Sequence, residues 1–298
     1  MNEIIKKIII ETLEKHDTVL RLLIYGFGGV CFKKQFKEIA GEKDDSFINF
    51  LIEHNFIKKV KLNKNTLLVA RYKLYSHYGL NNKSSVISGK RILHSSLYAE
   101  YLIRCHGSDE RYIKKHLHAG TISFYAPEDA LNLLTRVSIH ANNHGHNTEY
   151  LSSSIEEIKN KVDFCKRKTK GNKEILKKSF ISRQTKDILT LKDNSVYIMG
   201  VNYDGMSYIF EVGIFAHTLR FDKIIKQLNI TDTVIRSTFF GLPVKINITV
   251  YSHFAENKGY SVRTEKYLNK NNYPNSVKFL FFNSKRKLFS GIDIDKWL

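Results

Sequence analysis

This chain has little proline, little cysteine and no long apolar run, and the last two of these shortages each exclude a class of protein. Its 298 residues include three prolines and three cysteines. Cys31, Cys105 and Cys165 lie far apart and form no CxxC pair, which argues against a disulfide framework and against a zinc ribbon. No apolar run reaches the roughly 18 residues that a membrane span needs. The first residues lack a signal-peptide pattern, so we expect a cytoplasmic protein without membrane contact.

Acidic residues are scarce relative to basic ones. The 48 Lys and Arg residues outnumber 29 Asp and Glu residues, which gives a formal net charge of +19. With 42% hydrophobic residues the chain has material for packed cores, so this is not the charge of a disordered basic tail. Nucleic acid is the first partner that such a charge predicts, because each phosphate contact releases condensed counterions. The abundance of Lys, Asn and Ile also fits an AT-rich genome, so charge alone assigns no function.

The apolar pattern divides the chain into three stretches within an α+β fold. We predict a winged-helix DNA-binding domain over 1–83 and a helical, basic connecting region over 84–192. We predict an α/β domain over 193–298, where alternating strand patterns and helical spacing follow one another. The strands of this last domain are predicted over four segments, 195–202, 206–212, 244–251 and 277–282. Its helices are predicted over 218–228 and 255–270.

The first stretch has the order of a winged helix. Helical spacing covers four segments, 4–16, 19–25, 32–39 and 47–54. Two alternating segments, 56–62 and 66–74, follow and are joined by a turn at 63–65. Helices, a tight corner at Gly41, another helix and a two-stranded hairpin predict a winged helix-turn-helix.

A winged helix binds duplex DNA by placing one helix in the major groove, while its hairpin reaches the adjacent backbone. The candidate recognition helix starts near Lys43 and carries Ser46, Asn49 and His54, and Asn49 suits a bidentate contact to adenine. Asp44 and Asp45 stand at the start of this helix, as caps or as charges that oppose a phosphate. The candidate DNA contacts are Lys33, Lys34, Lys37, Lys43, Ser46, Asn49, Lys58, Lys59, Lys61, Lys64, Arg71 and Lys73.

The middle stretch is predicted to be helical over 91–105, over 128–140 and from Ser152 onward. Pro127 suits the first turn of the second of these helices. The helix that begins at the serines becomes very basic between Lys159 and Lys178. It is either a second contact to the phosphate backbone or a solvated linker. The residues proposed for that second contact are Lys166, Arg167, Lys168 and Lys170.

Two groups of histidines are candidates for metal chemistry. His116-Leu117-His118 has the spacing of the metal-binding pair of rolling-circle nucleases, but it follows a helical pattern where that motif needs a strand. His140, His144 and His146 have a spacing that suits zinc, although no thiolate lies nearby. Histidines at the protein surface are the simpler interpretation of both groups.

The α/β stretch holds residues of a candidate nuclease site. Asp204 lies between two predicted strands, Glu211 ends the second strand, and Lys223 stands on the helix that follows. This layout is similar to the core of PD-(D/E)xK nucleases, in which an acidic residue and an ExK tripeptide hold a divalent metal that polarises water. The tripeptide here is Glu211-Val212-Gly213, so Lys223 would have to replace the missing lysine. An inactive nuclease-like domain without cofactor is the favoured interpretation.

Three segments together resemble the replication-relaxation family of plasmids and integrative elements. They are the winged helix over 32–74, the segment from Arg91 to Tyr98, and Tyr208–Val212 followed by Lys223. The resemblance implies a winged helix joined to a degenerate restriction-endonuclease-like core. It also implies a role in plasmid replication initiation or conjugative DNA processing.

The sequence leaves three functions open. The first is a sequence-specific duplex-DNA-binding protein of a mobile element, acting as a homodimer with replication or relaxosome proteins as partners. The second is a transcriptional regulator, such as an antitoxin-like repressor, which would use the same DNA-reading parts. The third is a Mg²⁺-dependent DNA nuclease that uses Asp204, Glu211 and Lys223.

Overall fold

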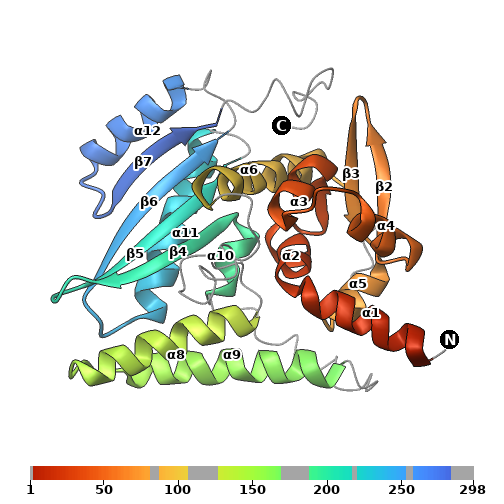
Figure 1. Cartoon of the computed structure of the whole chain (residues 1–298). Helices are drawn as coiled ribbons and strands as arrows, with labels where there is room; N and C mark the ends of the chain where they lie inside the picture. The colour runs from red at the N-terminus through yellow and green to blue at the C-terminus, as the bar shows by residue number, and fades with distance from the viewer. Residues whose placement is uncertain are drawn as a thin grey trace. The chain divides into compact units, whose positions relative to one another are not determined.

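The computed structural model describes residues 3–80, 87–106, 127–168, 188–216, 220–252 and 258–282, which fall into two compact units (Figure 1). The first unit holds the N-terminal elements and α6 (Gly89–His106). The second holds α8 (Pro127–Asn143), α9 (Glu149–Lys168) and every later element. The described helices of the expected connecting region over 84–192 are divided between these two units. Among the described helices, none combines the length and apolar character that crossing a bilayer requires.

The first unit is built from short helices and a three-stranded antiparallel sheet of order β1-β3-β2. In chain order its elements before α6 are α1 (Glu3–Lys15), α2 (Asp17–Arg21), the π-helical η1 (Leu22–Gly26), β1 (Val30–Phe32), α3 (Lys33–Ala40), α4 (Ser46–Glu53), β2 (Ile57–Leu62), β3 (Asn65–Ala70) and α5 (Tyr72–His77). The predicted helices and hairpin are confirmed, apart from their ends. β1 was not predicted, and β3 ends at Ala70 rather than at Leu74 because a further helix begins there.

The buried side chains of this unit show how α3 and α4 pack against its sheet. Phe32, Phe36 and Leu51 are fully buried, so α3 and α4 turn their apolar faces toward the sheet. α3 ends where Gly41 takes a left-handed conformation with φ of 68°, which a glycine adopts without steric cost. The corner that follows separates α3 from α4.

Helix α6 packs against the first unit through buried polar contacts. The side-chain amide of Gln35 in α3 donates to the carbonyl of Ser96 at 2.9 Å, and the Ser95 hydroxyl donates to the carbonyl of Val30 in β1. The ring of Tyr98 lies edge-on to Phe27, with 5.8 Å between centroids. The segment from Arg91 to Tyr98 therefore serves the packing of this unit.

The second unit is a four-stranded mixed sheet of order β4-β5-β6-β7 with helices. Besides α8 and α9 its elements are α10 (Leu189–Asp193), β4 (Val196–Tyr203), β5 (Tyr208–Phe215), α11 (Phe221–Thr238), β6 (Val244–Ser252), α12 (Lys258–Lys270) and β7 (Ser276–Phe281). β4 and β5 form an antiparallel hairpin, whereas β5, β6 and β7 are parallel. Each parallel pair is joined through a helix, as parallel strands require. All four predicted strands are confirmed.

Three boundaries in this unit differ from the expectation. α9 begins at Glu149, whose backbone N–H donates to the side chain of Asn147 at 3.0 Å, so Ser152 lies inside the helix. α11 continues to Thr238 instead of ending at Leu228. Glu211 lies in the middle of β5 and not at its end. Pro127 does occupy the first position of α8, where its missing N–H costs no hydrogen bond.

Candidate nucleic-acid interface

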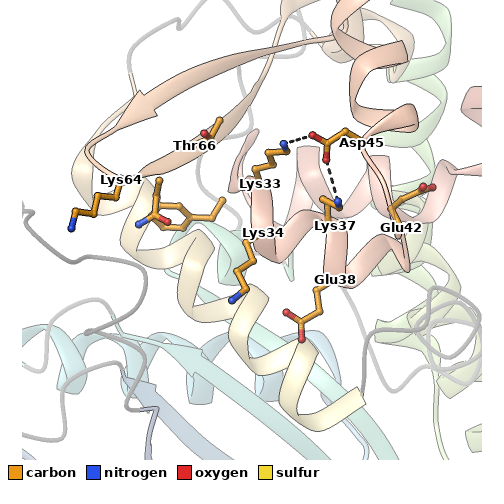
Figure 2. Close-up of a pocket in the computed structure, with 10 residues that line it drawn as sticks. Lys33, Lys34, Lys37, Glu38, Glu42, Asp45, Lys64 and Thr66 are labelled. Carbon is orange, nitrogen blue, oxygen red and sulfur yellow. Dashed lines mark hydrogen bonds and ion pairs between the residues drawn. The ribbon is translucent and has the colours of Figure 1, made fainter.

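Two neighbouring aspartates in the turn before α4 make different contacts. Asp44 accepts hydrogen bonds from the backbone N–H of Ser46 at 2.9 Å and from its hydroxyl at 2.7 Å. Asp45 stands at the N-cap position but makes no side-chain capping bond. Its carboxylate instead forms ion pairs with Lys33 and Lys37 of α3 (Figure 2), the latter at 3.1 Å. Asp44 therefore shapes the helix start, and Asp45 ties α3 to α4.

These ion pairs occupy two of the predicted phosphate contacts. Hydrogen bonding to Lys33, and then to Lys37, lowers the pKa of Asp45 from its usual value, so the carboxylate stays charged at neutral pH. The amine of Lys37 also donates to the backbone carbonyl of Lys43 at 3.3 Å. Both lysines are therefore engaged within the protein.

An open hollow of about 460 Å³ lies beside these ion pairs, between α3, the turn before α4 and the tip of the hairpin. Its lining includes the basic side chains of Lys33, Lys34, Lys37 and Lys64 together with three acidic ones. Figure 2 shows the amines of Lys34 and Lys64 pointing away from Asp45. These two lysines are exposed, so their charge is available to a partner at the surface.

The β2–β3 hairpin places one row of lysines on the side of α4. Lys59 donates to the side-chain oxygen of Asn49 at 3.3 Å. Successive side chains of a strand point to opposite faces, so Lys61 shares the face of Lys59 while Lys58 points to the other face. The exposed surface of α4 has no basic side chain of its own, since Ser46, Asn49 and Glu53 are its exposed residues. On this surface the positive charge therefore comes from Lys59 and Lys61 of the hairpin, and α4 contributes the exposed side-chain amide of Asn49.

Arg71 and Lys73 do not lie on the hairpin, contrary to the sequence prediction. Arg71 follows β3 and donates to the side chain of Asn55 at 2.7 Å. Lys73 stands on α5, where its amine donates to the carbonyl of His54 at 2.9 Å and lies 4.4 Å from the ring centre of Phe56. Both side chains therefore hold the C-terminal end of α4.

The predicted second contact falls at the edge of the described chain. Lys166, Arg167 and Lys168 are the last-turn residues of α9. Lys170 lies outside the described residues, as does most of the basic run that continues to Lys178. His116 and His118 also lie outside them.

The structure does not bring the three candidate nuclease residues together. Asp204 lies in the turn before β5. The hydrogen bond from Lys245, and after it those from two backbone N–H groups, lower the pKa of the Asp204 carboxyl to about 2. Lys223 stands in the first turn of α11, beyond the other end of β5, on the order of 20 Å away along the strand. Glu211 accepts a hydrogen bond from Asn247 at 2.7 Å. Its neighbour Phe210 packs on Phe239 at the end of α11, so Glu211 points away from that helix.

The second histidine group forms a ring cluster with two tyrosines of the β4–β5 hairpin. His140 lies in the last turn of α8 and His144 directly follows that helix, and their rings stack with 4.1 Å between centroids. Tyr203 lies 5.0 Å from His144 and 4.9 Å from Tyr208, and His146 is 5.8 Å from Tyr208. Of these three histidines, His144 is exposed, whereas His140 and His146 are partly buried within the cluster. Within the described residues, no three His, Cys, Asp or Glu side chains are placed to hold a metal ion.

We expect Tyr208→Phe to lower the free energy of unfolding by about 1 kcal/mol, because it removes a buried hydrogen bond. The Tyr208 hydroxyl lies 2.9 Å from Nδ1 of His140, and its side chain is 2% exposed. Tyr203→Phe is the matched control, since the Tyr203 hydroxyl donates to the carbonyl of Gly205 at an exposed turn and lies at the long distance of 3.5 Å from Nε2 of His146. Urea denaturation of both variants measures the difference. Equal losses in the free energy of unfolding would show that the hydrogen bond to His140 stabilises the fold no more than the exposed one does.

Comparisons with family profiles, with characterised proteins and with solved structures found no significant match. Neither the ion pairs of Asp45 nor the ring contacts of the histidine–tyrosine cluster was predicted from the sequence. A signal for the first was present, because Lys33 and Lys37 are one turn apart on α3 and therefore share a face.

Proposed function

We propose that this chain is a sequence-specific duplex-DNA-binding protein whose first unit acts as a winged helix. The element order β1-α3-α4-β2-β3 and the sheet order β1-β3-β2 are those expected of such a domain. The observation that carries the proposal is the contact between Lys59 and Asn49, which places a basic hairpin beside the exposed amide of α4. The charge of +19 supports a polyanionic partner.

In this mechanism α4 enters the major groove and the hairpin follows the backbone. Asn49 is exposed, and a carboxamide can bond both the N7 and the N6 of adenine. When Lys59 moves to a phosphate, its hydrogen bond to Asn49 is released, and the amide becomes available to the base. Lys61 and Lys64 are exposed on the same hairpin and would add phosphate contacts.

The biological role follows from the resemblance to the replication-relaxation family. On that basis the cytoplasmic protein acts on a mobile element, in replication initiation or conjugative DNA processing, with proteins of those assemblies as partners. The second unit then serves assembly, because its candidate catalytic residues are held apart by β5. A transcriptional repressor would use the same DNA-binding parts, and the position of its site at a promoter would identify it.

Footprinting of the full chain on plasmid DNA tests the proposal, with the Lys59→Glu/Lys61→Glu variant beside the wild type. We expect one discrete protected site that the double variant loses, because reversed charges on the α4 side of the hairpin repel the backbone. Lys58→Glu is the matched control, since Lys58 is on the opposite face, and it should retain most of the protection. Uniform salt-sensitive coating, or no protection, would contradict specific binding.

A further inference from the structure

Three polar side chains form the exposed stripe of α4. Ser46, Asn49 and Glu53 are exposed, whereas the other residues of this helix are buried or partly buried. At about 100° per residue, the three lie within roughly 60° of one another around the helix axis. They therefore share one narrow face, and the proposed function turns this face toward the base edges in the major groove.

Glu53 brings a negative charge to this stripe. It is the acidic residue of α4 and stands one helical turn beyond Asn49, with its side chain exposed. A carboxylate that faces DNA lowers the affinity for every sequence alike, because the phosphates repel it. A base that donates a hydrogen bond to the carboxylate offsets this repulsion, so Glu53 favours the sequences that carry such a base.

The groups at the edge of the major groove determine which base fits a carboxylate. Cytosine presents the amino group at N4, a donor, and no acceptor beside it on the same base. Adenine presents a donor at N6 next to an acceptor at N7, which matches the carboxamide of Asn49 but opposes a carboxylate. Guanine and thymine present acceptors. Glu53 is therefore suited to cytosine, as Asn49 is suited to adenine.

The spacing along α4 sets the distance between the two bases. Asn49 and Glu53 are four residues apart, which is about 6 Å along the helix axis. Successive base pairs are about 3.4 Å apart, so this distance corresponds to about two base-pair steps. We propose, as a deepening that rests on the proposed function, that α4 reads an A·T pair through Asn49 and a C·G pair two steps away through Glu53.

Ser46 makes a weaker choice at the other end of the stripe. Its hydroxyl donates to Asp44 at 2.7 Å, so its oxygen presents lone pairs to a partner. An accepting oxygen can receive a hydrogen bond from the amino group of adenine or of cytosine. We therefore expect the base pair nearest Ser46 to be less strictly selected than the other two.

Selection of bound duplexes from a random library, followed by sequencing, tests the assignment for the full chain. We expect the wild type to enrich C·G two positions from A·T by about tenfold or more over the other base pairs. Glu53→Gln should change the preferred pair at that position from C·G to A·T, because a glutamine, like an asparagine, pairs with adenine. Glu14→Gln is the matched control. It removes the same charge from an exposed position of α1 and should leave the selected motif unchanged.

A second variant tests whether the two contacts are separate. Asn49→Ala should lose the preference for A·T and keep the preference for C·G, because contacts to separated base pairs contribute almost independently. Both substituted side chains are exposed, so circular dichroism spectra of the variants should match that of the wild type.

The possible results distinguish the role of Glu53 from the proposed function. A motif that the wild type and Glu53→Gln select alike, or a motif without C·G at that position, would overturn the role of Glu53 and leave specific binding intact. Selection of no motif by the wild type would overturn the proposed function, and the base assignment with it. A change from C·G to A·T in Glu53→Gln alone would support both.

Discussion

Asp45→Asn should bind unrelated duplex DNA more tightly than the wild type and with a steeper dependence on salt. The carboxylate of Asp45 holds the amines of Lys33 and Lys37 on α3 by ion pairs. An asparagine cannot form ion pairs, so both lysines become available to phosphates. Two added phosphate contacts steepen the slope of log K against log salt by up to about 1.8 and raise affinity about tenfold at moderate salt.

Asp44→Asn is the control for this experiment. It removes the same charge at the adjacent position, but among the described residues Asp44 accepts from Ser46 and pairs with no lysine at hydrogen-bond distance. Fluorescence anisotropy of a labelled random duplex over a range of salt concentrations measures both slopes. If the two variants changed affinity equally, net charge alone would account for the gain, and the ion pairs of Asp45 would have no part in it.

The same variant should lose specificity. Phosphate contacts add affinity for every sequence alike, whereas the base contact that we propose for Asn49 would be unchanged by the substitution. The ratio of specific to nonspecific affinity therefore falls in Asp45→Asn. An internal carboxylate that competes with phosphates is a means of keeping a very basic protein from binding DNA indiscriminately.

Most elements of both units could be predicted from periodicity, because their sequences repeat at the spacing of the structure they form. From Ile246 to Val250 the strand β6 alternates buried and partly exposed side chains, and its limits were predicted to within one residue. β1 was missed because its three residues are all buried and show no alternation. The end of β3 was misplaced because the apolar pattern continues into α5, whose Leu74 and Tyr75 are buried.

The site was predicted less well, since its contacts join residues that are distant in sequence. Lys34, Lys59 and Lys61, chosen from the sequence as candidate DNA contacts, are exposed in the structure. Nothing local indicated that Asp45 would reach across to α3, or that Lys73 would turn to the end of α4. The ring cluster joins α8 to a hairpin more than sixty residues later, and only the fold brings them together.

Gly29→Ala should destabilise the first unit by more than about 3 kcal/mol, because two costs add at this position. The φ angle of Gly29 is +83°, a conformation that costs an L-residue roughly 1–2 kcal/mol. A Cβ added there would also lie 1.8 Å from the hydroxyl oxygen of Tyr75 and 2.8 Å from its ring carbon Cζ. Tyr75 is buried on α5, so it cannot move aside without opening the core.

Gly28→Ala separates the two costs. Its φ is also positive, at +60°, but an added Cβ would meet only the flexible side chain of Arg91, at 3.2 Å. We therefore expect a loss of only about 1 kcal/mol, from the backbone conformation alone. Thermal and urea unfolding of both variants measure the difference.

A double variant tests the steric cost itself. Gly29→Ala/Tyr75→Phe removes the oxygen that the new Cβ would strike, so it should recover part of the stability that Gly29→Ala loses, although Cζ remains too close for full recovery. The hydroxyl's own hydrogen bond to the carbonyl of Gly28 is long, at 3.3 Å, so Tyr75→Phe alone should cost little. A double variant no more stable than Gly29→Ala would mean that the backbone conformation, and not the approach of Tyr75, is what requires a glycine between η1 and β1.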